Sequence, residues 1–418
     1  MAFGTMGVDY EVRVDYDRLR RQRLERAKAQ LAKSGFGAFL CFDNNNIRYV
    51  TSSHIGEWSR DKMERCCLLP NTSDPVLFEV SSAAKVRRQS SPWLAGRIEQ
   101  AQPWSRSAVP SELGMPDRFA KKIKRMLSDF GVEKQPLGVD ILDVPLMKAL
   151  QKEGIEIADG QEQMLEARLV KTDDEVELLK ISAMMVDVTY RHIVEQLKPG
   201  ISENQIVAIA NKVLYDMGSD SVECVNVVSG ERTSPHPHLF TDRVIRPGDF
   251  VYIDIMQTFN GYRTCYYRTF VVGRPSQAQR EAYDTAYEWL KKAIDVVRPG
   301  VTTADIASVW PTGRETGLGN EEEAYLLQFG HGIGLSHRER PMISRLYSLE
   351  HPVKIEKNMV MALETYCGAK DSKQGARIEH EIVVTDDGCE VITGYPCDEL
   401  ICTWLPGVQR EVVDKSRS

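Results

Sequence analysis

The clearest pattern in the chain is the alternation of apolar and other residues between Val251 and Phe270, which has the two-residue period of a β-strand. The dipeptide Asn260-Gly261 interrupts this pattern near its middle. Asn-Gly suits a two-residue hairpin turn because both turn positions need a positive φ. The segment is therefore predicted to form a β-hairpin.

A two-residue turn at that place also predicts how the two strands of the hairpin are aligned. It pairs Asp254 with Tyr267 and Met256 with Cys265, so that Asp254 and Cys265 become diagonal neighbours on one face. A carboxylate inside an apolar strand is costly to bury unless it is paired or binds a metal. We therefore expect Asp254 and Cys265 to share a ligand; the alternative is an aspartate on the surface of an edge strand.

The first part of the chain alternates helix and strand patterns, which predicts an α/β domain over residues 1–165. Three of its residues, Arg48, Tyr49 and Trp58, are candidates for contact with a substrate, and the alternative for them is local packing at a strand end. The predicted elements are a helix ending at Ser34-Gly35, a strand Ala38–Phe42, a polar loop Asp43–Asn46, strands Val76–Val80 and Leu137–Ile141, and helices over 117–129 and 144–152.

Two helices with clear start signals follow this domain. The T-x-x-E box at Thr172 begins a long helix that ends before Pro199-Gly200, and a second capping box at Ser202 begins the next helix. A helix over 277–297 likewise ends before Pro299-Gly300 and is followed by another helix start. The order of signals therefore repeats along the chain.

The strands of this second part repeat as well. The segments Ile245–Asp254 and Ile355–Glu364 match in pattern, and a carboxylate follows the apolar strand at the same offset in each. We infer a duplicated helix–helix–strand unit over residues 172–275 and 276–395. A pseudo-two-fold axis would bring Asp254 and Glu364 to face each other.

Composition limits the class of protein. The chain has 418 residues, 42% hydrophobic and 27% charged, which is typical of a globular protein of two domains. Its net charge of −7 argues against nucleic acid as a partner, and no apolar run approaches the ~20 residues of a membrane span. The N-terminal segment lacks an apolar signal region, so the nine cysteines are expected to be reduced thiols in the cytoplasm.

The second part also places acidic and imidazole side chains in apolar or glycine-rich surroundings. Mixed carboxylate and imidazole ligands suit Mn, Fe, Co or Zn rather than Ca, and such a metal activates water. The alternative for each residue alone is a buried polar group with satisfied hydrogen bonds. The set comprises Asp254, His331 within FGHGIGL, Glu364 within MALETY and Glu379 within RIEHEIVV.

These motifs, together with DxxxxxNGYxxxxxRTF from Asp254, LVKTDDEVELLKIS and SGERTSPHP, resemble the creatinase/aminopeptidase P/prolidase family. The resemblance implies an α+β fold: a C-terminal pita-bread domain over 166–402, a smaller N-terminal α/β domain and a tail over 403–418. It also implies a homodimer in which the partner's N-terminal domain closes the active site.

By the same resemblance, the family's five metal ligands fall on Asp254, Cys265, His331, Glu364 and Glu379. The family has an aspartate where Cys265 stands. A thiolate ligates Zn or Fe but is a poor bridge between hard ions such as Mn. We therefore expect at most one divalent metal per chain, and the alternative is none, as in creatinases.

The resemblance also suggests residues for catalysis and substrate binding. His236 and His380 match functional histidines of creatinase, either is a candidate base with a near-neutral pKa, and Glu364 matches its retained glutamate. Tyr267 stands where creatinase has a glutamate. The peptidases have a histidine at the position of Arg338; here His337 precedes it, in a polar stretch suited to a carboxylate.

These features predict a hydrolase that cleaves a C–N bond in a small, carboxylate-bearing substrate. Three alternatives stay open. FDNNNIRYVT and SGERTSP resemble dimethylsulfoniopropionate lyases, which would make the protein a metal-dependent C–S lyase. The others are an Xaa-Pro peptidase and a peptide-binding pita-bread protein without activity.

Overall fold

The computed structural model describes residues 13–56, 63–94, 96–101, 108–316, 318–370 and 372–405. Trp58 and positions 406–418 of the predicted tail lie outside these residues. The chain divides into two units, Met1–Leu178 with Gly334–Arg340, and Leu179–Ile333 with Pro341–Ser418. In the described part of the chain, every helix is too short or too polar to cross a membrane.

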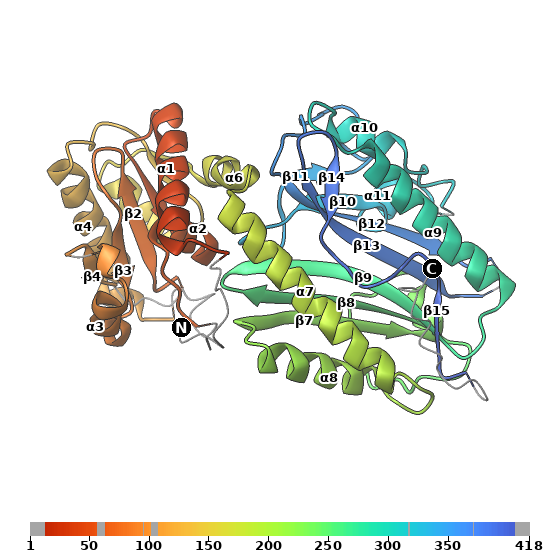
Figure 1. Cartoon of the computed structure of the whole chain (residues 1–418). Coiled ribbons are helices and arrows are strands. Elements are labelled where there is room, and N and C mark those ends of the chain that lie inside the picture. The colour runs from red at the N-terminus through yellow and green to blue at the C-terminus, as the bar shows by residue number, and fades with distance from the viewer. Residues whose placement is uncertain are drawn as a thin grey trace, which may run out of the picture. The chain divides into compact units, whose positions relative to one another are not determined.

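The N-terminal unit is built on one six-stranded sheet with the order β4-β3-β2-β1-β5-β6 (Figure 1). Phe78 and Phe119 meet edge to face in its core, with ring centroids 5.4 Å apart. The strands are β1 Ala38–Cys41, β2 Cys66–Pro70, β3 Val76–Glu79, β4 Ile98–Gln100, β5 Leu137–Val139 and β6 Ile157–Asp159. The helices are α1 Tyr16–Ser34, α2 Asn44–Thr51, α3 Ser81–Ser90, α4 Met115–Asp129, α5 Val144–Lys152 and α6 Gln161–Leu169.

The segment Asp43–Asn46 corrects one prediction. We expected a polar loop, but Asp43 is the N-cap of α2 and its side chain accepts a hydrogen bond from the backbone N–H of Asn45 at 2.6 Å. Asp and Asn favour helix N-caps as strongly as loops, because their short side chains bind nearby backbone N–H groups. The polar run is therefore the start of a helix.

The second unit contains two sheets, with orders β15-β9-β8-β7 and β11-β10-β12-β13-β14. Helices α7 and α8 pack on the first sheet and α9 packs on β12 and β13 (Figure 1). The helices are α7 Asp173–Gln196, α8 Glu203–Asp216, α9 Gln277–Val296, α10 Thr303–Ser308 and α11 Glu321–Ala324. The strands are β7 Ser221–Ser229, β8 Phe250–Phe259, β9 Tyr262–Val272, β10 Phe329–Gly332, β11 Glu339–Ile343, β12 Val360–Gly368, β13 Gly375–Val384, β14 Cys389–Val391 and β15 Ile401–Thr403.

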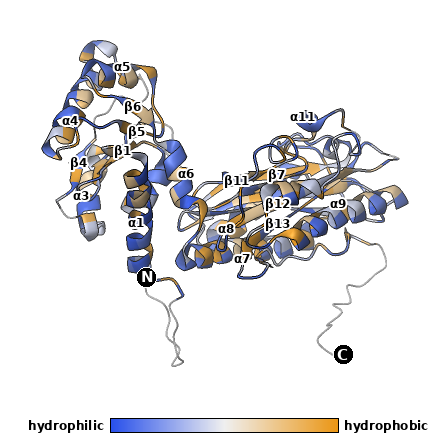
Figure 2. Cartoon of the chain, turned by 90° about the horizontal axis from the view of Figure 1, so that it is seen from above, coloured by the Kyte–Doolittle hydropathy of each residue, from blue (hydrophilic) through white to orange (hydrophobic). Residues whose placement is uncertain are grey.

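Helix α9 shows how the sequence pattern determines packing. Its buried residues include Tyr283, Ala286, Leu290 and Ala293, which are three or four positions apart and therefore lie on one side of the helix. Figure 2 shows the resulting alternation of hydrophobic and hydrophilic bands along α9. The apolar side covers β12 and β13, two strands that carry candidate ligands.

The predicted hairpin is confirmed. Strands β8 and β9 are joined by Asn260 and Gly261, with φ of 47° and 88°. Asp254 is the register partner of Tyr267, and Met256 is the register partner of Cys265, as the two-residue turn required. The capping boxes at Thr172 and Ser202 are confirmed as well.

The duplication is confirmed by hydrogen bonds that recur in both halves. Gly200 N–H donates to the carbonyl of Ile245 at 3.0 Å, and Gly300 N–H donates to the carbonyl of Ile355 at 3.0 Å. Each of these two isoleucines returns a bond, to Ile201 at 2.9 Å and to Val301 at 2.8 Å.

The two halves meet where β9 lies beside β13. The hydroxyl of Thr269 donates to the carbonyl of Arg377 at 2.6 Å and accepts from the N–H of the same residue at 2.9 Å. This contact brings the inner strands of the two halves, and the ligand candidates on them, to one place.

Candidate metal centre

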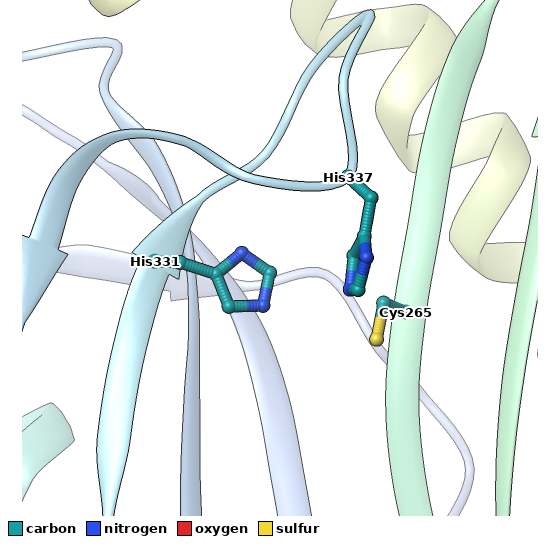
Figure 3. A group of neighbouring side chains, drawn as sticks. All are labelled: Cys265, His331 and His337. Atoms are coloured by element: carbon teal, nitrogen blue, oxygen red, sulfur yellow. The ribbon is translucent and has the colours of Figure 1, made fainter. Parts of the chain in front are cut away.

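All five predicted ligands converge in the second unit, on the facing sides of its two sheets. Their side chains form two overlapping groups whose ligand atoms lie within 4.8 Å of one another: His331, Glu364 and Glu379, and Asp254, Cys265 and Glu379. Each residue is at most 3% exposed. Figure 3 shows the imidazole of His331 on β10 turned toward the strand that carries Cys265.

Glu379 belongs to both groups and is their centre. It is fully buried, and neither of its carboxylate oxygens has a hydrogen-bond partner among the described residues. Burial, with the nearby carboxylates of Glu364 and Asp254, raises the pKa of Glu379 well above its usual range. A buried carboxylate without donors is costly unless a cation binds it, so its environment fits a metal ligand.

His331 is oriented by the backbone of its own strand. Its Nδ1 lies 3.0 Å from the carbonyl of Gly332, which favours a proton on Nδ1 and leaves Nε2 as the metal-binding atom. Nε2 lies 4.0 Å from Oε1 of Glu379. A Cβ at Gly330 would come within 2.8 Å of the carbonyl of Ala362, so a glycine there allows β10 to approach β12 closely.

Asp254 and Cys265 are tied to each other. The thiol of Cys265 donates to Oδ1 of Asp254 at 3.4 Å, and the side-chain amide of Asn226 donates to Oδ2 at 3.2 Å. Burial raises the pKa of Asp254, and burial together with the carboxylate of Asp254 raises the pKa of the Cys265 thiol well above its usual range. Cys265 is therefore a thiol in the protein alone.

Arg377 is a residue of this centre that the sequence analysis missed, although it stands in the RIE motif. It is 1% exposed and forms an ion pair with Glu364. Its guanidinium carbon lies 4.6 Å from the ring centroid of Tyr267. Within the described ranges its Nε and Nη1 have no hydrogen-bond partner, so two buried nitrogen donors are available to an anionic ligand.

His236 is held between two tyrosine hydroxyls. Its Nε2 lies 2.7 Å from the hydroxyl of Tyr267 and its Nδ1 lies 2.8 Å from the hydroxyl of Tyr252. Burial, with the positive charge of Arg377 nearby, strongly lowers the pKa of His236. The expected near-neutral pKa is wrong, because the desolvation of this ring was not visible in the sequence; His236 is a neutral imidazole at pH 7.

His380 is not brought to this centre. It follows Glu379 on β13, and successive strand residues point to opposite faces. On that other face its Nδ1 lies 2.7 Å from the hydroxyl of Thr393 and its Nε2 lies 3.1 Å from the thiol of Cys397. Burial lowers its pKa well below the usual range, so the near-neutral pKa expected for this residue is also wrong.

The remaining candidates belong to the N-terminal unit. Tyr49 is fully buried and its hydroxyl donates to the carbonyl of Ala167 at 2.7 Å, which is the packing role considered as the alternative. Arg48 is half-buried on α2. His337 is half-buried and Arg338 is exposed on the loop that follows β10, which groups with this unit.

Comparison with known proteins agrees with these motifs. Residues 177–386 match metallopeptidase family M24, and residues 23–170 match the creatinase/prolidase N-terminal domain. The chain therefore belongs to metallopeptidase family M24, in the creatinase/aminopeptidase P/prolidase group, and is a hydrolase by family.

Relatives within the family carry different names. An Xaa-Pro dipeptidase of Pyrococcus furiosus is 28% identical over 54% of this chain and 63% of its own length. An uncharacterised peptidase of Bacillus subtilis is 29% identical over 59% of this chain and 68% of its own. A dimethylsulfoniopropionate lyase of Roseovarius nubinhibens is 23% identical over 95% of this chain and 91% of its own length.

Solved structures show the same fold. A prolidase from Thermococcus sibiricus aligns with a TM-score of 0.74 at 24% identity, covering 93% of this chain and 99% of its own. An Xaa-Pro dipeptidase from Bacillus anthracis aligns with a TM-score of 0.73 at 23% identity, covering 92% of this chain and 99% of its own. The expected fold, a pita-bread domain with a smaller N-terminal α/β domain, is confirmed.

Proposed function

We propose that this hydrolase cleaves a C–N bond in a small, carboxylate-bearing substrate and uses at most one divalent metal ion. The proposal rests mainly on the environment of two residues, Glu379 and Arg377. Both are buried, and in the described part of the chain both have unpartnered polar atoms of opposite charge. Glu379 suits a metal cation, and Arg377 suits a substrate carboxylate.

His331, Glu364 and Glu379, with Asp254 beside them, would hold Fe, Zn, Mn or Co. When bound there, such an ion would supply Lewis-acid chemistry, which polarises a substrate carbonyl and lowers the pKa of water. Cys265 replaces the second aspartate of the family and offers one soft atom in place of two hard oxygens. The second divalent position is therefore weak or empty.

The residues of the chain itself would position and protonate the substrate. Arg377 would bind the carboxylate through Nε and Nη1, which fixes the orientation of the scissile bond. Glu364, which is paired with Arg377, would accept the proton of the attacking water. The hydroxyl of Tyr267, bonded to the neutral ring of His236, would supply a proton to the leaving nitrogen.

Metal stoichiometry tests this proposal. We expect one tightly held metal per chain in the native protein, rising toward two in Cys265→Asp, measured by elemental analysis of freshly purified protein. Two divalent metals in the native protein would contradict the mononuclear site. No metal in either protein would favour a metal-free reaction that depends on His236.

Substrate size and assembly give a second test. We expect the protein to be a homodimer at micromolar concentration and to release the first residue of Xaa-Pro peptides slowly, whereas small amides or guanidino compounds that carry a carboxylate are hydrolysed. Release from Xaa-Pro peptides as fast as by a true aminopeptidase would restore the peptidase interpretation.

A C–S lyase is the second candidate, favoured by the near full-length match to the Roseovarius nubinhibens enzyme. The same centre would then bind the carboxylate of dimethylsulfoniopropionate at Arg377. Consumption of dimethylsulfoniopropionate by the native protein, without hydrolysis of any amide, would establish the lyase and exclude the hydrolase.

A further inference from the structure

One buried carboxylate closes the base of the loop that carries His236. Glu203 lies in the first turn of α8 and is fully buried. One of its oxygens, Oε1, accepts hydrogen bonds from the backbone N–H of Ser229 at 2.9 Å and from the hydroxyl of the same residue at 2.7 Å. The other oxygen, Oε2, accepts from the backbone N–H of Thr241 at 2.7 Å and from its hydroxyl at 2.8 Å. Ser229 and Thr241 are thereby held together, and we call the residues between them, 230–240, the His236 loop.

An arginine of the His236 loop completes this contact. Arg232 forms an ion pair with Glu203, and its Nη1 also donates to the hydroxyl of Thr241 at 3.2 Å. Its Nη2 donates to the carbonyl of Leu239 at 2.6 Å. Hydrogen bonds to a charged group are stronger than those between neutral groups. The charge of Glu203 is therefore balanced by the loop itself, and the carboxylate connects the start of the loop to its end.

The duplication of the second unit supplies an internal comparison for Glu203. Its backbone N–H donates to the carbonyl of Arg243 at 3.1 Å, and in the second half the N–H of Thr303 donates to the carbonyl of Val353 at 2.9 Å. At that equivalent position the neutral hydroxyl of Thr303 accepts from the N–H of Val353 at 3.0 Å, within the same contact. The contact between helix and strand therefore does not require a carboxylate. The charge of Glu203 serves the His236 loop instead.

The conformation of this loop determines which nitrogen of His236 carries the proton. The backbone N–H of His238 donates to Nδ1 of His236 at 3.3 Å. Because a backbone N–H can only donate, Nδ1 is an acceptor, and the proton of the neutral ring lies on Nε2. Nε2 then donates to the hydroxyl oxygen of Tyr267 at 2.7 Å. This arrangement leaves the hydroxyl proton of Tyr267 for the leaving nitrogen of the substrate.

We propose that Glu203 is a positioning residue for the reaction. By closing the base of the His236 loop, it holds the backbone N–H of His238 against Nδ1 of His236 and thereby fixes the tautomer that is protonated on Nε2. The benefit to catalysis rests on the proposed function, in which Tyr267 supplies a proton. The tautomer itself is a property of the protein without substrate, so it can be measured without turnover.

NMR of the ring nitrogens in the full chain labelled with ¹⁵N-histidine tests the proposal at pH 7. The chain has eight histidines, and the signals of His236 are those that disappear in His236→Gln. We expect Nε2–H in the native protein and a mixture of both tautomers in Glu203→Gln, whose amide group presents N–H donors to the donors of the loop. With a hydrolysed substrate, kcat should fall roughly 10–100-fold and KM should change little, because Arg377 is untouched.

Thr303→Val, which alters the equivalent contact in the second half, is the matched control and should keep the native tautomer and kcat. Thr241→Val is a milder change at the loop end and replaces Glu203→Gln if that variant does not fold. A native ring protonated on Nδ1, or an unchanged tautomer in Glu203→Gln, would overturn the proposal, and so would the same change in Thr303→Val. If the native protein hydrolyses no amide, the proposed reaction fails, and the tautomers alone decide the role of Glu203.

Discussion

At the scale of single residues, the centre combines buried charges that would be unfavourable without ligands. Glu379 has no donor for either oxygen within the described residues, and Arg377 has two nitrogen atoms, Nε and Nη1, without acceptors. Leaving a buried polar group unpaired costs about 1–3 kcal/mol, and more for a charged group. Such a cost is concentrated at functional sites, where a bound ion and substrate supply the missing partners.

The first prediction concerns Arg377→Gln. Removing a charged partner of the substrate carboxylate should cost about 1.5–3 kcal/mol, a fall in kcat/KM of roughly 10–150-fold. The fall should be much smaller for the amide analogue of the same substrate, which has no charge to bind. Arg345→Gln, which alters a half-buried arginine paired with Glu321, is the control.

An equal fall for the acid and the amide would contradict a carboxylate-binding role for Arg377 and indicate a structural role instead. Metal content must be measured in the same samples, because Arg377 also pairs with Glu364. A variant that loses its metal would report on the ligand and not on substrate binding.

The sequence predicted which candidate side chains come together better than it predicted their chemical state. Four motifs placed Asp254, His331, Glu364 and Glu379, and each was recognisable because a polar residue interrupts an apolar or glycine-rich pattern. The protonation state of His236 was not predictable, since its pKa depends on burial between Tyr252 and Tyr267, which come from distant segments.

At the scale of elements, local signals gave correct predictions where one residue type has one structural role. Asn260-Gly261 made the hairpin turn, and the capping boxes at Thr172 and Ser202 began helices. The segment Asp43–Asn46 was misread because the same residues favour loops and helix N-caps. Whether the segment caps a helix or forms a loop depends on the sheet whose strand β1 precedes it.

That helix start contains a buried interaction that predicts a pH dependence. Asp140, after β5, accepts hydrogen bonds from the backbone N–H groups of Phe42 at 2.7 Å and Asp43 at 3.1 Å, and from the side chain of Asn46 at 2.8 Å. Burial nevertheless raises the pKa of Asp140 to about 6. The carboxyl group therefore connects β5 to the start of α2, and it stays protonated to a higher pH than an exposed aspartate does.

Because the folded pKa lies above the unfolded value of about 3.9, the contribution of Asp140 to stability is full below pH 4 and is lost as the pH rises through 6. The native protein should lose roughly 1–2 kcal/mol from this source between pH 4.5 and pH 7. Asp140→Asn cannot ionise and should lack this slope.

Hydrogen exchange of the amides in β1 and α2, corrected for intrinsic rates, measures this pH-dependent loss of stability in the N-terminal unit. Asp129→Asn, which alters an exposed carboxylate at the end of α4, is the control and should keep the native slope. The same pH dependence in Asp140→Asn as in the native protein would show that another group is responsible.

At the scale of the whole molecule, the duplication explains both the centre and its asymmetry. The register pair Glu364 and Glu379 of the second half occupies the place that Asp254 and Tyr267 occupy in the first half. Two carboxylates stand on one side and one on the other, so we expect the strongest position for a divalent metal to lie with His331 in the second half. The repeat was visible in the sequence, but the contact of β9 with β13 that joins the halves was not.

This asymmetry predicts how metal affects the stability of the protein. Metal at about 100 times its dissociation constant stabilises the folded chain by about 2.7 kcal/mol if the unfolded chain does not bind it. For a unit of roughly 150–250 residues, this corresponds to a rise in Tm of several degrees in the transition of the second unit. Chelator should reverse the rise.

Glu379→Gln separates function from stability, because its two effects have opposite signs. It removes a buried carboxylate that has no donors in the described structure, so the metal-free variant should be more stable than the metal-free native protein by about 1–3 kcal/mol. It also removes a candidate ligand common to both groups, so added metal should no longer raise its Tm.

Differential scanning calorimetry with metal and with chelator measures both effects. The control is Glu390→Gln, a surface change on β14, which should behave as the native protein does. If added metal raised the Tm of Glu379→Gln as much as that of the native protein, the ion would bind elsewhere. Glu379 is the one carboxylate common to both candidate groups, and His331, Glu364 and Asp254 without it do not join them.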